Sequence, residues 1–304
     1  MQRFEVTILG TGSASPTTKR NPTAQLLNAS ERFFLIDCGE GTQVQLRKNK
    51  LSMHRIDHIF ISHLHGDHYL GLLGLLQSLH LLGRKNPLTL YCFPELKEII
   101  DVQNKYSQTV LNYQINYVYT NPKKSEVIFE DNKITITSFP LQHRIPCCGF
   151  IFREKETGRR IVKEALEQHH VSTAEIYKLR KGINAINDNG VEIDFKLLTK
   201  SPDKTRSYAF CSDTCYNEDI IQYIMGVDLL YHESTFLKDM KERAKATFHS
   251  TAEEAALIAQ KAGVKKLLLG HFSARYDDVT PFLTEAQSVF ENTLLSNEGE
   301  KFKI

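Results

Sequence analysis

The 304-residue sequence contains no long hydrophobic run, no C-x-x-C pair and no excess of charge of one sign. No stretch approaches the roughly 18 consecutive apolar residues of a membrane-spanning helix, and the first residues lead directly into a strand pattern. We therefore expect a cytoplasmic protein with no membrane partner. The 38 lysines and arginines nearly balance the 36 aspartates and glutamates, which argues against unselective coating of nucleic acid but allows a local basic patch.

The six cysteines are scattered and include one vicinal pair, Cys147 and Cys148. This pattern is typical of free thiols in a reducing compartment rather than of a disulfide framework. Cys211 and Cys215 flank Asp213, but packing in the core explains them better than metal binding does. With 41% hydrophobic and 24% charged residues, the composition indicates a folded chain that is long enough for one large α/β domain or two smaller ones.

Strands and helices are predicted in two successive groups. The first group has strands over 4–10, 24–27, 32–36, 56–62 and 88–93, with helices over 42–48, 70–82 and 95–106. The second has strands over 115–120, 126–130, 133–142, 149–152, 208–212, 229–231 and 266–270, with helices over 218–225, 252–262 and 280–292. Residues 153–200 interrupt the second group. They are rich in charge and loop signals and have few large apolar residues for a core, which predicts an inserted arm.

One histidine-rich turn carries the strongest chemical signal. The strand over 56–62 is followed by His63-Leu64-His65-Gly66-Asp67-His68, which offers four potential metal ligands in six residues. In an extended segment His63 and His65 point the same way, and Gly66 lets the chain turn so that Asp67 and His68 face a neighbouring point. Imidazole and carboxylate together suit Zn²⁺. The alternative, a surface turn without metal, leaves this clustering at a strand end without a purpose.

Three more candidate ligands each follow a predicted strand: His143, Asp213 and His271. A site for two ions with open positions for water and substrate needs about seven or eight protein contacts. Each of the three residues alone would more often be an ordinary loop residue. Together with the histidine-rich turn, they complete the number that a two-ion site requires.

These ligand positions resemble those of the metallo-β-lactamase superfamily. Within it, residues 1 to about 290 resemble the short form of the ribonuclease Z family, which processes the 3′ ends of tRNA. The resemblance lies in the stretches 9–14, 37–43, 232–235, 248–251 and 270–276. It implies an α/β fold, the four-layer αββα sandwich of two mixed sheets with helices outside. Residues 1–304 would form a single metallo-β-lactamase domain, with residues 153–200 as an inserted flexible arm that binds tRNA.

The resemblance also implies the roles of individual residues. Two Zn²⁺ ions per subunit would be held by His63, His65 and His143 on one side and by Asp67, His68 and His271 on the other, with Asp213 as the bridge. Two such ions lower the pKa of a shared water toward about 7 and offset charge on the phosphate. Asp67 is then the proton acceptor. His249, oriented by Glu233, supplies a proton to the departing ribose 3′ oxygen.

His249 and Asp37 also have structural interpretations. Ser250 or Thr251 is suited to cap a helix that begins at Ala252, so His249 is a neighbour of that cap as well, and the two roles are compatible. Asp37 ends a strand before Gly39-Glu40-Gly41 and is expected to brace the histidine-rich loop.

Precursor tRNA is the expected partner, and two segments are candidates for contacting it. Residues 153–181 contain eight basic and five acidic residues, a modest surplus that suits a phosphate backbone. The candidate contacts in the arm are Arg159, Arg160, Lys178, Arg180 and Lys181. The Gly-Pro that is frequent in this family's arm is absent, and a solvated helical insertion is the alternative.

The second segment is the loop over 16–21, which resembles the family's Pro-x-Lys-x-Arg-Asn loop. In the family this loop is linked to rejection of tRNAs that already carry CCA. Thr18 stands where the family has lysine, whereas Arg20 and Asn21 match. These two residues are the candidate contacts with the RNA 3′ end.

The leading hypothesis is a zinc-dependent, homodimeric endoribonuclease that removes the 3′ trailer from precursor tRNA. It leaves a 3′-hydroxyl on the tRNA and a 5′-phosphate on the trailer. A small-molecule phosphodiesterase or arylsulfatase on the same dizinc scaffold is the alternative, and it would not need the arm. A di-iron redox protein is disfavoured because His65 stands where such relatives carry glutamate and no flavin module is attached. An inactive RNA-binding relative is disfavoured because every ligand position is filled.

Overall fold

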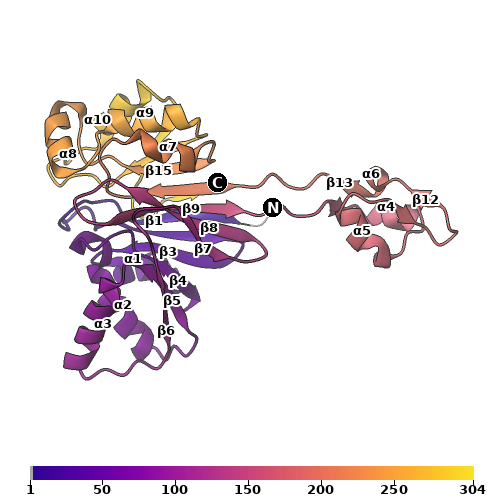
Figure 1. Cartoon of the computed structure of the whole chain (residues 1–304), viewed down its shortest axis with the longest axis horizontal. Coiled ribbons are helices and arrows are strands. Elements are labelled where there is room, and N and C mark those ends of the chain that lie inside the picture. Colours follow the sequence, from indigo (N-terminus) through magenta and orange to yellow (C-terminus); the bar gives the residue numbers. More distant parts are fainter. Residues whose placement is uncertain (1–2) are drawn as a thin grey trace. The chain divides into compact units, whose positions relative to one another are not determined.

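A computed structural model describes residues 3–304 (Figure 1). The described residues form two compact units: residues 154–205 make up one, and residues 3–153 together with residues 206–304 make up the other. Within the described residues, no helix combines the length and the apolar character needed to cross a membrane.

Two seven-stranded sheets form the larger unit. The strand order of the first sheet is β18 (Lys301–Lys303), β1 (Phe4–Gly10), β2 (Ala24–Ala29), β3 (Arg32–Cys38), β4 (Ile56–Phe60), β5 (Leu88–Cys92) and β6 (Ile115–Tyr119). The order of the second is β17 (Thr293–Leu295), β16 (Leu267–Gly270), β15 (Leu229–Glu233), β14 (Ser207–Cys211), β9 (Cys147–Glu154), β8 (Ile134–Leu141) and β7 (Glu126–Glu130). Strands β3 to β6 and β14 to β17 run parallel. The pairs β1–β18, β1–β2, β2–β3, β7–β8 and β9–β14 are antiparallel. Both sheets are therefore mixed, as expected.

The two sheets enclose an aromatic core, and helices cover their outer faces. Phe60 of β4 meets Phe150 and Phe152 of β9, with ring centroids 5.3 and 5.4 Å apart. The first sheet packs against α1 (Thr42–Lys48), α2 (Gly66–Leu81) and α3 (Glu95–Tyr106). The second packs against α7 (Ile221–Ile224), α9 (Ala252–Ala262) and α10 (Thr280–Gln287), and α8 (Lys241–Thr247) lies on the same side (Figure 1). The predicted four-layer αββα sandwich is confirmed.

Several elements differ from their predicted bounds. Helix α2 begins at Gly66 rather than at residue 70, so Asp67 and His68 lie in its first helical turn and not in a free loop. The leucine pattern that predicted this helix starts only at Leu70. Helix α10 ends at Gln287, five residues before the predicted end. Strands β17 and β18 were not predicted, because three-residue strands are too short to show a period of two. Helix α8 was also missed, since Ala244 is its only buried residue.

The smaller unit has more internal structure than its sequence predicts. Its helices are α4 (Lys163–Gln168), α5 (Ile176–Arg180) and α6 (Phe195–Leu198), and its short strands are β10 (Arg160–Ile161), β11 (Ala185–Ile186), β12 (Glu192–Ile193) and β13 (Thr199–Lys200). Strand β10 pairs antiparallel with β13, which joins the two ends of the insertion. The expectation of too few apolar residues for a core was wrong, because five of them are buried together: Leu166, Val171, Leu179, Ala185 and Leu198.

Asp37, the residue before the last of β3, fastens the histidine-rich segment that follows β4. Its carboxylate accepts the Ser62 backbone N–H at 2.8 Å, the Ser62 hydroxyl at 2.8 Å and the His68 Nδ1–H at 2.7 Å. The side chain is fully buried. Helix α2 lies directly on the loop after β3, since a Cβ on Gly71 would come within 2.0 Å of the Gly39 carbonyl oxygen. The expected bracing role of Asp37 is confirmed.

We predict that Asp37→Ala destabilises the protein by on the order of 3 kcal/mol, because each buried donor left without a partner costs about 1–3 kcal/mol. Urea denaturation of the metal-free protein measures this loss. Asp37→Asn is the matched control: it keeps an acceptor oxygen and suits the left-handed backbone at this position, where φ is 53°. It should therefore lose less than the alanine variant. An alanine variant as stable as the parent would contradict the bracing role.

Candidate metal centre

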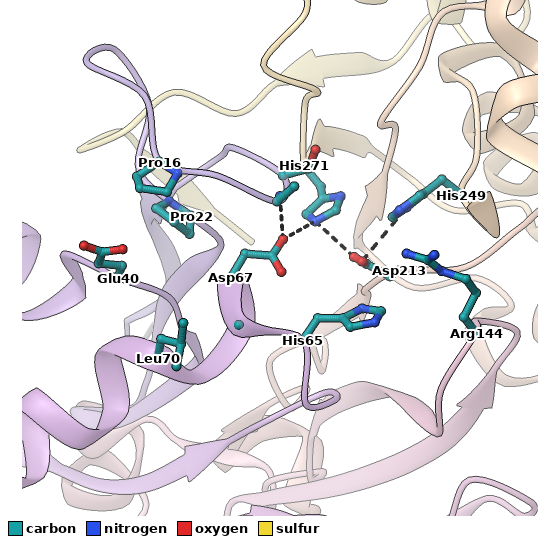
Figure 2. A pocket seen from close by; sticks show the side chains of 13 residues that line it. Pro16, Pro22, Glu40, His65, Asp67, Leu70, Arg144, Asp213, His249 and His271 are labelled. Atoms are coloured by element: carbon teal, nitrogen blue, oxygen red, sulfur yellow. Dashed lines mark hydrogen bonds and ion pairs between the residues drawn. The ribbon is translucent and has the colours of Figure 1, made fainter.

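The seven predicted ligands come together at one end of the two sheets. His63 and His65 follow β4, and Asp67 and His68 lie in the first turn of α2. The other three each follow a strand of the second sheet, as predicted: His143 after β8, Asp213 after β14 and His271 after β16. Figure 2 shows His65, Asp67, Asp213 and His271 directed into one pocket. Its volume is about 400 Å³, and His249 also lines it.

The ligand atoms fall into groups in which all atoms lie within 4.8 Å of one another. One group is His63, His65, His143 and Asp213, and a second is Asp67, His68 and His271. These are the two sets that the family resemblance implies. A third group, Asp213, His249 and His271, overlaps them at the centre of the pocket.

Asp213 lies between the two sets and turns one oxygen toward each. Its Oδ2 is 3.5 Å from His63 Nε2 and 3.7 Å from His143 Nε2. Its Oδ1 is 3.3 Å from His68 Nε2 and 3.1 Å from His271 Nε2. The residue is buried, and within residues 3–304 Oδ1 has no hydrogen-bond partner. A carboxylate in this position is suited to bridge two cations.

Outward hydrogen bonds orient four of the imidazole rings. The Nδ1–H of His143 donates to the Phe248 carbonyl at 2.9 Å, and that of His68 donates to the Asp37 carboxylate at 2.7 Å. The Nδ1–H of His271 donates to the Thr235 hydroxyl at 2.9 Å, and that of His63 donates to the Ser62 hydroxyl at 3.0 Å. The hydroxyls of Ser62 and Thr235 accept these bonds because their own hydrogens go to the carboxylates of Asp37 and Glu233. In a neutral ring whose Nδ1 carries the proton, Nε2 has a free lone pair. The Nε2 atoms of all four rings face the Asp213 carboxylate.

The inward arrangement fits metal ions better than it fits an empty polar core. His65 Nδ1 lies 3.0 Å from Nε2 of both His63 and His143, and the Nε2 atoms of His68 and His271 are 3.3 Å apart. Buried acceptors that face each other without enough protons are costly, and a divalent cation between them removes that cost. A cation would also stabilise Oδ1 of Asp213, which is buried without a hydrogen-bond partner among the described residues. A mixed imidazole and carboxylate set is a donor set for zinc and similar ions.

Burial and mutual charge set the protonation of these groups. Burial lowers the pKa of His65 and of His143 to about 4, so both rings are neutral at physiological pH. Burial raises the pKa of Asp213, but the imidazoles of His271 and His68 outweigh it and hold that pKa well below its ordinary value. Burial lowers the pKa of His68, but the carboxylates of Asp213, Asp67 and Asp37 more than offset this effect and hold that pKa well above its ordinary value. Without metal, the His68 ring therefore carries an added proton, which a cation bound at its Nε2 would displace.

His249 and Glu233 form a second pair beside the ligand groups. Glu233, the last residue of β15, is fully buried, and its Oε1 accepts the His249 Nδ1–H at 2.8 Å. Burial lowers the pKa of His249, but the Glu233 carboxylate more than offsets this effect and the pKa rises to about 9. The expected helix cap is also present, since Thr251 and Glu254 form a capping box at the start of α9. The structural interpretation of this segment is therefore confirmed.

Arg20 and Asn21 make contacts within the protein. The Arg20 guanidinium donates to the carbonyls of Ser273 (3.3 Å) and Tyr276, and Asn21 donates to the Glu298 carboxylate at 2.7 Å. The Arg20 bonds tie the loop over 16–21 to the loop that follows His271, and the Asn21 bond ties it to the turn between β17 and β18. The pocket wall on this side is formed by Pro16 and Pro22, and the backbone N–H of Ala14 donates to Asp67 at 2.7 Å.

The five candidate arm residues belong to the smaller unit. Arg159 donates to Thr199 (2.7 Å), Arg160 pairs with Asp203 (2.7 Å), Lys178 pairs with Glu175 (3.0 Å), and Lys181 donates to the Tyr177 hydroxyl (2.6 Å). The Arg180 side chain is exposed. Most of these charges are thus held by neighbours of the same unit.

Sequence reasoning missed the residues that orient the rings. Ser62 and Thr235 were not singled out, although Thr235 lies in one of the stretches that carry the family resemblance. Their signal was position alone: Ser62 directly precedes His63, and Thr235 lies two residues after Glu233. The Phe248 carbonyl could not be found from residue type, since it is a backbone group.

Comparisons with known proteins agree with this geometry. The family model described as the anti-Pycsar protein Apyc1 matches residues 4–290. The ribonuclease Z of Phocaeicola vulgatus is 45% identical over 304 residues (all of this chain and 98% of the relative), and that of Cytophaga hutchinsonii is 46% identical over 302 residues (99% of this chain and 96% of the relative).

Solved structures give the same result. The crystal structure of the short form of human tRNase Z matches with a TM-score of 0.70 and 26% identity, over 98% of each chain. The metallo-β-lactamase fold protein YhfI from Bacillus subtilis matches with a TM-score of 0.69 over all of both chains, and at 18% identity it shows the fold alone. The chain belongs to the family that the Apyc1 model describes and, with its full-length relatives, to the ribonuclease Z family.

Proposed function

We propose that this chain is a metal-dependent endoribonuclease that removes the 3′ trailer from precursor tRNA. The observation that carries the proposal is the position of Asp213, with one oxygen toward each of two ligand groups and the His249–Glu233 pair beside it. Full-length relatives named ribonuclease Z support the assignment of RNA as substrate. The direct test is incubation with a 3′-extended precursor tRNA and mapping of both product ends.

Two Zn²⁺ ions per subunit are the proposed cofactors. His63, His65 and His143 would hold one ion and Asp67, His68 and His271 the other, with Asp213 shared between them. When bound, such ions activate water for attack on a phosphodiester and offset the charge that develops on the phosphate. The ionised carboxylates and the inward lone pairs described above support this assignment of ligands.

The remaining chemistry belongs to side chains of this chain. Asp67 faces the pocket, held by the Ala14 N–H, and is the proposed acceptor of the proton from the attacking water. The Nδ1–H of His249 is fixed by Glu233, which leaves its Nε2 to donate a proton to the departing ribose 3′ oxygen. The bond between phosphorus and that oxygen breaks, so the tRNA keeps a 3′-hydroxyl and the trailer a 5′-phosphate.

The assembly and architecture complete the proposal. We propose a homodimer that works in the cytoplasm, built from a single metallo-β-lactamase domain into which an RNA-binding arm over residues 153–200 is inserted. Exposed apolar side chains at the ends of two helices of the first sheet support association between copies, namely Leu81 of α2 and Tyr106 of α3, which are 81% and 78% exposed. A phosphodiesterase or arylsulfatase acting on small molecules is the alternative, and it would have no use for the arm.

Replacing Asp213 with alanine should release at least one ion and abolish most of the cleavage of precursor tRNA, since the bridge between the two ligand groups is lost. Metal content by mass spectrometry and single-turnover cleavage measure the two effects. Asp101→Ala, at an exposed aspartate of α3, is the matched control and should keep both ions. An Asp213 variant with full metal content and full activity would refute the ligand assignment.

For His249→Ala we expect cleavage to slow by about 10²-fold or more with metal content intact, because general acid catalysis typically contributes roughly 10²–10⁴-fold. A substrate with sulfur in place of the departing 3′ oxygen tests the reason, since a thiolate leaves without protonation. The deficit of the variant should shrink on that substrate. An equal deficit on both substrates would remove His249 from the role of acid.

Changing Arg159, Arg160, Lys178, Arg180 and Lys181 to glutamine should raise KM for precursor tRNA and flatten its salt dependence. Each lost phosphate contact lowers the slope of log affinity against log salt by roughly 0.7–0.9. Binding measured across a series of salt concentrations gives this slope. The control variant changes Lys163 and Lys196, which lie in the same unit, and should behave like the parent. If the five-residue variant keeps the parent's slope and KM, residues 153–200 are a solvated insertion and tRNA is held elsewhere.

A further inference from the structure

A second chamber adjoins the pocket of the metal centre. It has a volume of about 520 Å³ and shares Ser13, Ala14, Arg144 and His249 with that pocket. Its remaining wall comes from the loop after β15, from α8 and from the loop after His271. The chamber therefore opens onto the reacting centre on the side where His249 stands.

Three arginines line this chamber: Arg144, Arg243 and Arg275. All three are exposed, and none makes an ion pair or a side-chain hydrogen bond with any of residues 3–304. Arg144 lies in the loop between β8 and β9, next to the predicted ligand His143, and Figure 2 shows its guanidinium reaching toward Asp213 and His249. Arg243 and Thr247 are one turn apart in α8 and both face the chamber.

The lining has one sign of charge. Among the described residues that form the wall there is no aspartate or glutamate. A cavity on another side of His249 has a lining of mixed charge. It contains Lys241 and Lys245 but also Glu242 and Glu254. Lys241 pairs with Glu254 at 3.4 Å. Unpaired guanidinium groups that converge without a carboxylate are suited to bind phosphate oxygens in a forked geometry.

The position of His249 indicates which phosphate of the RNA the arginines would bind. This step rests on the proposed function. His249 protonates the ribose 3′ oxygen that leaves, so the nucleotide carrying that oxygen lies on the His249 side. The 5′ phosphate of the same nucleotide is one ribose away from the scissile phosphate. We propose that Arg144 and Arg243 clamp this phosphate, which stays on the tRNA after cleavage. The clamp holds the leaving oxygen in line with His249.

A precursor tRNA with an uncharged methylphosphonate at this one linkage tests the clamp in single-turnover cleavage. The parent protein should lose about 10- to 100-fold in kcat/KM, as is typical for loss of a hydrogen bond to a charged group. Arg243→Gln and Arg144→Gln should each lose about tenfold or more on the unmodified RNA. Their further loss on the methylphosphonate RNA should be small, because the contact is already absent, which is the signature of direct coupling.

Controls separate a local contact from a general effect. Arg47→Gln changes an exposed arginine of α1 outside the chamber and should show the parent's kinetics on both RNAs. Arg243→Lys should recover part of the loss, since it restores the charge but not the fork. The thermal midpoints of all variants should equal that of the parent, because the replaced side chains have no partners in the described chain.

Three results would overturn the clamp. The first is a parent protein that is insensitive to the methylphosphonate, and the second is a parent that is sensitive only when the neutral linkage lies on the trailer side of the cut. The third concerns the arginine variants: the methylphosphonate would lower their kcat/KM by the same factor as it lowers that of the parent protein. A parent protein that cannot cleave unmodified precursor tRNA would refute the proposed function itself, and the clamp with it.

Discussion

The structure depends on a group of buried acceptor atoms that face one another with too few protons between them. Imidazole nitrogens of His63, His65, His68, His143 and His271 converge on the carboxylate of Asp213 within a few ångströms, and Oδ1 of that carboxylate has no hydrogen-bond partner among residues 3–304. Such an arrangement is unfavourable in an uncharged core and favourable around divalent cations. The outward bonds from the Nδ1 atoms to Asp37, Thr235, Ser62 and the Phe248 carbonyl hold it in place. Much of the buried polar network around the pocket therefore serves to aim lone pairs inward.

The two-sheet architecture explains why ligands so distant in sequence meet. In each sheet a run of parallel strands brings successive strand ends to the same edge. The first sheet supplies the turn after β4 and the second supplies His143, Asp213 and His271. The aromatic layer between the sheets fixes their spacing. A residue such as Asp213 can then face ligands from both sheets, which neither sheet alone could achieve.

The sequence predicted the parts of this site that depend on residue type next to a strand. His63 to His68, His143, Asp213 and His271 could be found because metal-binding side chains directly followed strong strand patterns. The start of α2 at Gly66 could not, since neither glycine nor His65 gives a helix-start signal. Strands β17 and β18 are held by pairing at the sheet edges and have almost no pattern of their own. The small core of residues 154–205 depends on which few apolar residues meet, and composition does not record that.

The distribution of charge around the pocket separates bond cleavage from substrate choice. The centre itself carries buried carboxylates and imidazoles, a donor set for divalent cations. In the proposed function these ions would act on a single phosphodiester whatever is attached to it. The chamber beside His249 has unpaired arginines and no carboxylate in its described wall, so it prefers a substrate with a further phosphate next to the one that is cut. A monomeric phosphodiester has no such group, whereas every RNA chain does. Under the proposed clamp, the choice between a polymer and a small ester is made within this pocket, which leaves the choice among RNAs to other surfaces of the chain.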